Sequence, residues 1–367
     1  MRGTTDQAMN TSRRMLAPIA LALGLVLVQP GGPLAPPQIA LAQEQGRVPG
    51  DALGSTSDAE FWREIRRGQQ GTVSIPNKQA GVMVQSEGES WRAIRNGPLS
   101  VWGGWALLGI VALLALFFAL RGRIRIEHGR SGRTITRFGF VERFTHWLTA
   151  TCFVVLALTG LNLLYGRYAL LPLIGADAFA TLTLWGKYAH NYLAFGFMLG
   201  LVLMLVLWIA HNFPNRHDLV WLAKGGGMFK RGVHPPAKKF NAGQKIIFWL
   251  VILGGISVSL SGIMLLFPFR LSMFGETFAW VNWLFGTQYP SQLAPLQEMQ
   301  LAQVWHAIMG LFLTVVIIAH IYIGTVGMEG AFDAMGSGRV DENWAREHHD
   351  QWVRDLQRKG VLTGGDD

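Results

Sequence analysis

Four of the ten histidines lie inside long apolar stretches that resemble membrane spans: His146, His190, His306 and His320. An ionisable side chain is costly in the hydrocarbon layer, so it usually faces the interior of a helix bundle and has a function there. His306 and His320 share one stretch and lie fourteen residues apart. This separation corresponds to about 21 Å along a helix and to nearly the same helix face. One helix would therefore present an imidazole near each membrane surface, which suits two stacked cofactors.

The composition indicates an all-α integral membrane protein. Half of the 367 residues are hydrophobic and only 15% are charged, which is unusual for a soluble domain. The formal charge of +9 is concentrated in particular loops, and we expect no nucleic-acid partner. Cys152, the only cysteine, lies in an apolar run, so an intrachain disulfide and a cysteine-bound iron–sulfur cluster are excluded. Any redox chemistry must therefore use histidine ligands.

Five apolar stretches approach the length of about 20 residues that a helix needs to cross a bilayer. They cover residues 101–120, 146–165, 184–211, 246–267 and 301–328, and tryptophans cluster at their ends, as is typical of the membrane interface. The sequence thus predicts five transmembrane helices, of which the last four form a four-helix bundle that carries the histidines.

The charges of the connections predict the orientation. Seven arginines lie between the first two spans and seven basic residues between the third and fourth, whereas the other two connections contain only Arg167 and Arg270. Basic loops stay on the cytoplasmic side. We therefore expect a multi-pass protein with a periplasmic N-terminal segment and a cytoplasmic C-terminus.

The N-terminus has the features of a signal peptide. Arg13 and Arg14 precede an apolar run at 15–28, and small residues around Ala42 fit a cleavage site; an uncleaved anchor is the alternative. A short helix is predicted at 57–67. The expected division of the chain is a signal peptide at 1–42, a periplasmic segment at 43–98, an additional span at 99–121, a membrane domain at 122–330 and a cytoplasmic tail at 331–367.

With this orientation the four histidines fall into two pairs of matching depth. His190 pairs with His306 near the outer surface, and His146 pairs with His320 near the inner surface. Two facing imidazoles can bind the iron of a b haem, and no CxxCH motif for covalent attachment is present. The glycines near these histidines would leave room for porphyrin rings or close helix packing; they are Gly160, Gly196, Gly200 and Gly310. A packing or proton-relay role is the alternative for a single histidine, and we interpret the other six as ordinary interfacial, loop or tail residues.

A polar loop before the fourth span is the second candidate site. Asn241, Gly243 and Gln244 lie at the start of this span, on the same side as the His146/His320 pair. Donors of this kind beside an apolar slot can bind the carbonyl oxygens of a quinone. The same residues can equally cap the helix, and the sequence leaves both interpretations open.

Several of these segments together resemble the gamma subunit of respiratory formate dehydrogenase, the cytochrome b556 subunit. The similar segments are VERFTHW at 141–147, YAH at 188–190, FNAGQK at 240–245, WH at 305–306, AHIY at 319–322 and NWAREHH at 343–349. The resemblance spans roughly residues 137 to 359. The leader, the outside segment and the first span have no counterpart in the shorter four-span form of that family.

The resemblance implies a subunit of the bacterial inner membrane with two b haems, His146 and His320 binding the inner iron and His190 and His306 the outer iron. It also implies a site for ubiquinone or menaquinone at Asn241, Gly243 and Gln244. The expected partners are an iron–sulfur subunit and a catalytic subunit with molybdenum or tungsten pterin, so this chain would not itself oxidise formate. The alternatives are a di-haem cytochrome b of a hydrogenase or another molybdoenzyme, and a haem-free membrane anchor or carrier.

Overall fold

The computed structural model describes residues 88–362. The predicted signal peptide at 1–42, the predicted helix at 57–67 and most of the segment at 43–98 lie outside these residues. The described chain divides into two units. The smaller unit contains residues 88–97 and 267–304, and the larger contains 98–266 and 305–362.

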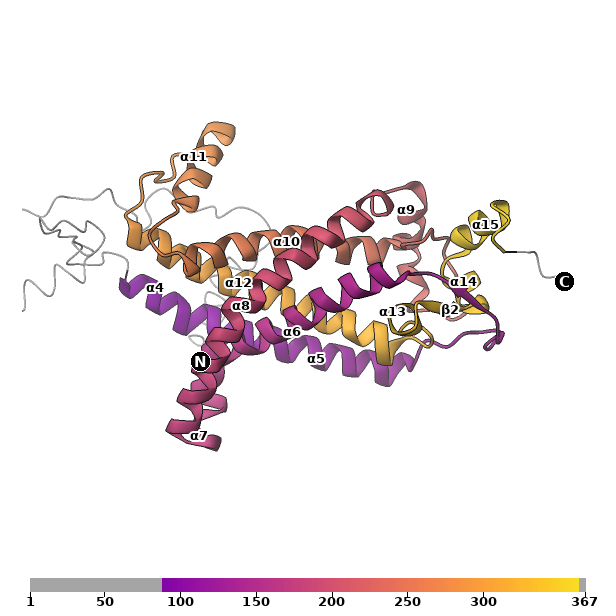
Figure 1. Ribbon diagram of the computed structural model, residues 1–367, viewed down its shortest axis with the longest axis horizontal. Helices are drawn as coiled ribbons and strands as arrows, with labels where there is room; N and C mark the ends of the chain where they lie inside the picture. The colour runs from indigo at the N-terminus through magenta and orange to yellow at the C-terminus, as the bar shows by residue number, and fades with distance from the viewer. Residues whose placement is uncertain (1–87, 363–367) are drawn as a thin grey trace, which may run out of the picture. The chain divides into compact units, whose positions relative to one another are not determined.

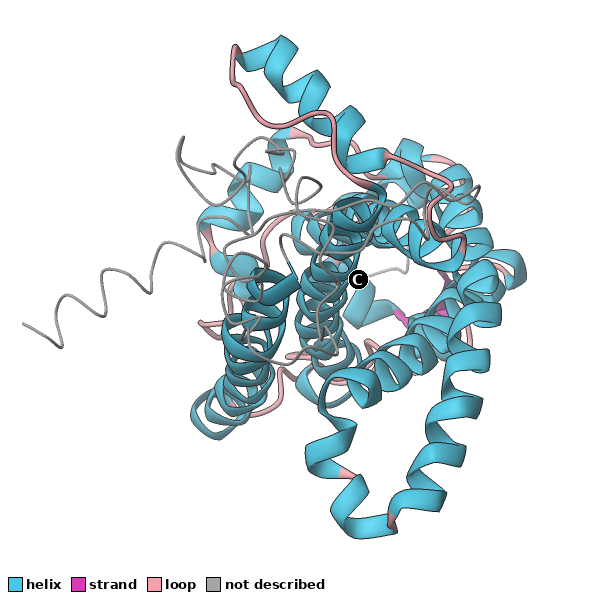
Figure 2. Ribbon diagram, turned by 90° about the vertical axis from the view of Figure 1, so that its left-hand side faces the viewer, coloured by secondary structure: helices cyan, strands magenta, loops and turns pink. Residues whose placement is uncertain are grey.

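The larger unit contains most of the long helices (Figure 1). They are α5 (Ser100–Arg121), α6 (Phe140–Ala169), α8 (Ala176–Trp208), α10 (Ala242–Leu266) and α12 (Pro295–Tyr322), the last of which begins in the smaller unit. Shorter elements connect them: α7 (Leu171–Ile174), α9 (Arg216–Ala223), α13 (Asp333–Gly336), α14 (Glu342–His348), α15 (Asp350–Arg358), β1 (Thr134–Thr136) and β2 (Arg339–Asp341). The smaller unit contributes α4 (Gly88–Ile94) and α11 (Met273–Phe285). Helices thus dominate the described chain, and strands form only a short pair (Figure 2).

Within residues 88–362, five helices are long and apolar enough to cross a membrane, in the order and places that the sequence predicted. They cover Ser90–Arg121, Phe140–Ala169, Ala176–His211, Ala242–Leu266 and Pro295–Gly327. Most extend several residues beyond the predicted stretches, because helical hydrogen bonding continues where the apolar side chains stop. His146 consequently lies within the second turn of α6 rather than at its start. His190 lies fourteen residues into α8 instead of near its end.

Glycines set the close approach of the bundle helices. A Cβ at Gly196 of α8 would lie 2.9 Å from the Cys152 sulfur of α6, and a Cβ at Gly200 would overlap the Thr149 hydroxyl. Between α10 and α12, a Cβ at Gly254 would lie 2.9 Å from the Leu313 side chain. Small residues at such contacts let helix backbones pack closely in a membrane, where water supplies no hydrophobic drive between helices.

The loops and the C-terminal segment form a folded cap at one end of the bundle (Figure 1). β1 pairs antiparallel with β2, and Trp344 and Ala345 of α14 are almost completely buried. Glu142 of α6 ties the cap to the helices, since it accepts hydrogen bonds from the Trp208 indole of α8 and from the Lys239 ammonium. Residues 331–362 of the predicted C-terminal tail thus form part of this folded cap.

The cap also buries a histidine that the sequence did not single out. His349 has no exposed surface, and its Nδ1 lies 2.7 Å from the Lys238 carbonyl. Burial holds the pKa of His349 well below its usual value, so the imidazole is neutral and donates to this carbonyl. His349 therefore serves to fix the segment that leads into α10.

We predict that Gly200→Val forces α6 and α8 apart, because the added side chain would overlap Thr149. Overpacking of this kind costs about 1–3 kcal/mol and should lower the thermal unfolding midpoint of the purified chain by several degrees. Gly109→Val is the matched control, since a Cβ at Gly109 of α5 meets nothing within 4 Å. Equal midpoints for the two variants would contradict the proposed packing.

Candidate functional site

The outer pair joins α8 to α12. The imidazole rings of His190 and His306 face one another with their centroids 6.1 Å apart and their planes inclined by 62°. The sequence prediction that these two residues lie at the same depth is therefore consistent with the structure.

Hydrogen bonds fix the ring orientation of the outer pair. The Nδ1 of His306 lies 3.0 Å from the Val258 carbonyl of α10, which can only accept. The Nδ1 of His190 lies 2.8 Å from the Thr159 hydroxyl of α6, whose own proton is donated to the Val155 carbonyl. Both rings are thus inferred to carry their proton on Nδ1. The Nε2 lone pairs remain available as metal ligands, in the manner of histidines oriented by a second hydrogen bond.

The inner pair joins α6 to α12. The rings of His146 and His320 have their centroids 6.2 Å apart and are inclined by 56°. The Nδ1 of His146 is buried and has no hydrogen-bond partner within the described residues. A buried polar atom without a partner is costly, and such an atom in a facing imidazole pair indicates a site built for a further group.

Two helices give the same separation between the pairs. On α12 the two histidines are fourteen residues apart. On α6 the inner level is set by His146, and the outer level by Gly160, whose Cβ would lie 3.6 Å from the His190 ring. Fourteen residues correspond to about 21 Å of rise on either helix, so the two pairs occupy two distinct levels of the bundle.

The geometry fits an iron porphyrin at each level. Two imidazole nitrogens bound at about 2 Å on opposite sides of a metal are about 4 Å apart, and their ring centroids are then about 6 Å apart. Both observed separations agree with this value. A Cβ at Gly310, between the two histidines of α12, meets nothing within 4 Å, so there is open space beside that helix. Within residues 88–362 no cluster of three or more histidine, cysteine or carboxylate side chains could hold a bare metal ion.

The loop before α10 forms a reciprocal cap. The Asn241 backbone N–H donates to the Gln244 Oε1 (3.1 Å), and the Gln244 backbone N–H donates to the Asn241 Oδ1 (2.9 Å). The capping interpretation of these residues is therefore confirmed. It uses only the two side-chain oxygens, and the side-chain N–H₂ groups remain donors that could bind a quinone.

A buried arginine orients this loop from the cap. Arg137, which is only 4% exposed, donates to the Lys239 carbonyl (2.6 Å) and to the Gln244 Oε1 (3.1 Å). Its guanidinium lies over the Phe138 and Trp344 rings. Burial lowers the pKa of Arg137 to about 9, which still leaves it charged at neutral pH. Sequence reasoning counted this residue only among the basic loop residues.

The last residue of the polar loop has a structural role. Lys245 is buried, and its ammonium forms a 2.8 Å ion pair with Asp218 of α9 and donates to the Phe213 carbonyl. This contact fixes the start of α10 against α9. The interaction explains a charge that the sequence alone would assign to a solvated loop.

The helical bundle and its two facing histidine pairs define a membrane cytochrome b. Residues 137–338 match the sequence family described as prokaryotic cytochrome b561, and the chain belongs to this family. The family implies haem b, which favours the haem-carrying interpretation over a haem-free anchor or carrier. The chain is accordingly a multi-pass membrane protein.

Characterised relatives agree with the resemblance seen in the sequence. The chain is 26% identical over 228 residues to the cytochrome b556(Fdn) subunit of the nitrate-inducible formate dehydrogenase of Escherichia coli K12, covering 62% of this chain and 93% of that subunit. It is 26% identical to the b556(fdo) subunit of the same organism, covering 61% and 94%. It is 24% identical to the formate dehydrogenase cytochrome b556 subunit of Haemophilus influenzae, covering 63% and 87%.

We predict that Arg137→Met loosens the loop before α10, because the Lys239 carbonyl loses its buried donor. A hydrogen bond from a charged group contributes about 1.5–3 kcal/mol, so amide exchange in residues 238–244 should accelerate about tenfold or more, as measured by hydrogen–deuterium exchange. Arg339→Met is the control, since Arg339 is exposed on β2. Unchanged exchange in the Arg137 variant would show that the arginine does not anchor the loop.

Proposed function

We propose that the chain is the membrane electron-transfer subunit of a formate dehydrogenase complex. It would pass electrons from an iron–sulfur subunit through two b haems to the quinone pool. The observation that carries this proposal is the presence of two facing histidine pairs, at separations of 6.1 and 6.2 Å, in a chain similar to formate dehydrogenase cytochrome b556 subunits.

The proposed ligands are His190 and His306 for the outer iron and His146 and His320 for the inner iron. A bound b haem supplies a reversible one-electron couple at each level. The chain holds each imidazole by its Nδ1 or by packing, and so presents Nε2 in one direction. Thr159 and Val258 are the acceptors that hold the outer rings.

The proposed quinone site is the loop of Asn241, Gly243 and Gln244. The Arg137 Nη2 donates to the Lys239 carbonyl and to the Gln244 Oε1, which also accepts from the Asn241 backbone N–H. Because Oε1 is occupied, the Gln244 Nε2–H₂ is the part of the side chain that can donate to a quinone carbonyl. The loop also lies close to the inner level. On α10, Ser261 contacts His306 of the outer pair, and Ile247 lies fourteen residues earlier, which is the separation between the two levels. Gln244 comes three residues before Ile247.

We further propose that the cap faces the cytoplasm and the opposite end of the bundle faces the periplasm. The basic loops and the C-terminal segment gather in the cap, as expected from the positive-inside rule. Electrons that enter at the outer pair and leave at the inner pair would then carry negative charge toward the cytoplasm. Moving one charge across the membrane is worth about 2.3 kcal/mol per 100 mV, so the subunit would contribute to the membrane potential.

The partners in this proposal are the iron–sulfur subunit and the catalytic subunit with molybdenum or tungsten pterin. The chain itself would not act on formate. It would accept electrons on the outer side and take the protons for quinol from the cytoplasmic side. The segment at 43–98, which precedes the part of the chain that matches the family (137–338), would bind the iron–sulfur partner.

We predict that the purified chain binds two haems and that His320→Ala or His306→Ala leaves one. The pyridine haemochrome assay measures this content, and His217→Ala, outside both pairs, should retain two. In the complete complex, His320→Ala should abolish quinol formation while formate oxidation with an artificial dye persists. A colourless wild-type chain, or normal quinone reduction in the His320 variant, would refute the assignment.

A second substitution separates quinone binding from helix capping. Gln244→Glu keeps an oxygen that accepts from Asn241 and Arg137 but removes the Nε2–H₂ donor. We expect kcat/KM for quinone to fall about tenfold, the size expected for one hydrogen bond of about 1.4 kcal/mol, with the haem content unchanged. Since a purely capping role would leave quinone reduction intact, wild-type kinetics in this variant would exclude Gln244 from the quinone site.

A further inference from the structure

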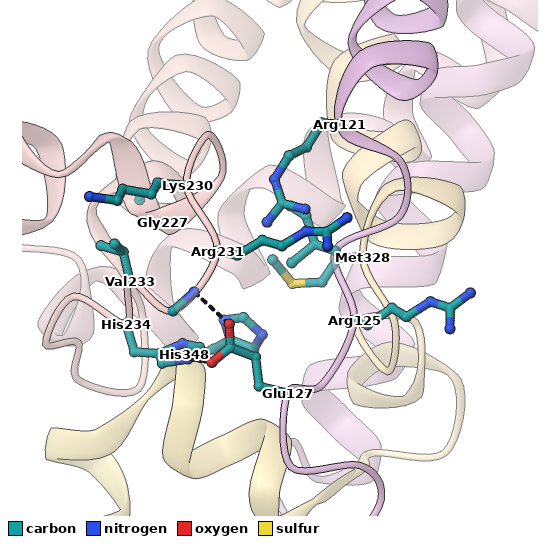
Figure 3. A pocket seen from close by; sticks show the side chains of 13 residues that line it. Arg121, Arg125, Glu127, Gly227, Lys230, Arg231, Val233, His234, Met328 and His348 are labelled. Atoms are coloured by element: carbon teal, nitrogen blue, oxygen red, sulfur yellow. Dashed lines mark hydrogen bonds and ion pairs between the residues drawn. The ribbon is translucent and has the colours of Figure 1, made fainter.

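A basic pocket lies where the end of α5 meets the cap. The residues that line it come from the last residue of α5 and the segment that follows it, from the glycine-rich segment before α10, from the chain just beyond α12, and from α14 (Figure 3): Arg121, Ile124, Arg125, Glu127, Gly226, Gly227, Lys230, Arg231, Gly232, Val233, His234, Met328 and His348. This pocket is separate from the two histidine pairs and from the loop at 241–244, and the proposed function does not use it.

The charges of the basic pocket are unbalanced. Four fixed positive charges stand against one carboxylate, and that carboxylate is already engaged: Glu127 accepts from the Gly232 amide and forms a 2.9 Å ion pair with His234. The pKa of Glu127 is lowered, chiefly by its hydrogen bond with His234. The carboxylate of Glu127 therefore interacts with Gly232 and His234 in the wall of the pocket and does not balance the four basic side chains.

The cations, in contrast, have few partners. Arg125, Lys230 and Arg231 make no hydrogen bond or ion pair within the described part of the chain. Arg121 donates only its Nε, to the Met228 carbonyl. Figure 3 shows the guanidinium groups of Arg121 and Arg231 on the same side of the pocket, next to Met328. Like charges held near one another disfavour each other unless an anion lies between them.

A neutral imidazole completes the pocket wall. The His348 Nε2 is buried and has no hydrogen-bond partner among the described residues. Burial lowers the pKa of His348 to about 4, so the ring is uncharged at neutral pH. A buried polar atom without a partner, beside several cations that make no ion pair within the described residues, is an independent sign that the pocket can bind a ligand.

The pocket continues into an apolar surface at the end of a span. Arg121 is the last residue of α5, and Phe117, one turn earlier, packs edge-on against Phe229 of the pocket segment with centroids 5.8 Å apart. Phe229 and Leu120 are 71% and 80% exposed. A ligand here would meet positive charge at one end and exposed hydrocarbon at the other.

We propose that this pocket binds the phosphate headgroup of an anionic phospholipid, with Arg121, Arg231 and Lys230 around the phosphate and the acyl chains along Phe229 and Leu120. Basic pockets at the ends of transmembrane helices bind such headgroups. The bound lipid would join α5, which buries no side chain of its own, to the cap.

The test uses the full chain in nanodiscs or mixed micelles, with binding of fluorescent phosphatidylglycerol and phosphatidylcholine measured by titration. We expect a clear preference for phosphatidylglycerol. Lys230→Gln combined with Arg231→Gln should weaken phosphatidylglycerol binding about 25-fold, since each basic side chain near an anionic headgroup contributes about fivefold. Arg123→Gln combined with Arg339→Gln removes the same charge from exposed positions outside the pocket and should retain wild-type binding.

Three outcomes would overturn the proposal. Equal binding of the two lipids by the wild-type chain would show that the pocket does not recognise the anionic headgroup. Full competition by inorganic phosphate at the concentration of the lipid would show that the pocket takes a free anion without the hydrocarbon part. Loss of affinity in the control variant equal to that in the pocket variant would assign the effect to net charge alone, and would equally reject the site.

Discussion

The cost of an imidazole in hydrocarbon constrains the whole bundle. Each of the four membrane histidines must find a partner inside the protein, and the structure provides one by turning pairs of helices toward each other at two levels. The imidazole rings of the outer pair are held by hydrogen bonds that they donate to acceptors on α6 and α10. The glycines that permit these helices to approach, Gly196, Gly200 and Gly254 among them, are then a requirement of the site as well as of the packing.

The cap is connected to this apolar bundle through a few buried or half-buried charges. Arg137 donates to Gln244 of α10, Glu142 of α6 accepts from the Lys239 ammonium, and Lys245 of α10 pairs with Asp218 of α9. A buried charge is tolerated only when it is paired, so these contacts allow little freedom in how the cap sits on α6 and α10. These contacts fix the conformation of the loop of Asn241 and Gln244.

Much of this arrangement could be predicted from the sequence, because its causes are local. Apolar length located the five spans, and helical rise placed His306 and His320 at two levels. The pairing with His190 and His146 followed from depth alone. The extent of the helices was less predictable, since hydrogen bonding carries α8 well beyond its apolar stretch.

The features that could not be predicted from the sequence depend on contacts between distant segments. Nothing local marks Arg137 as buried, or His349 as the anchor of Lys238 more than one hundred residues away. The order of the C-terminal cap likewise comes from pairing of β1 with β2, which are two hundred residues apart in sequence. For Gln244 the sequence left capping and quinone binding open as two alternatives, because the oxygen and the nitrogen of one amide can serve different partners.

α12 contributes one imidazole to each pair, whereas the opposing rings come from two different helices, α8 and α6. A shift or rotation of α12 along its axis would therefore disturb both levels together. A movement of α8 would reach only the outer one. The two histidine pairs therefore depend on the helices in different ways. A movement that changes both pairs must involve α12, whereas a movement of α8 or of α6 can change one pair alone.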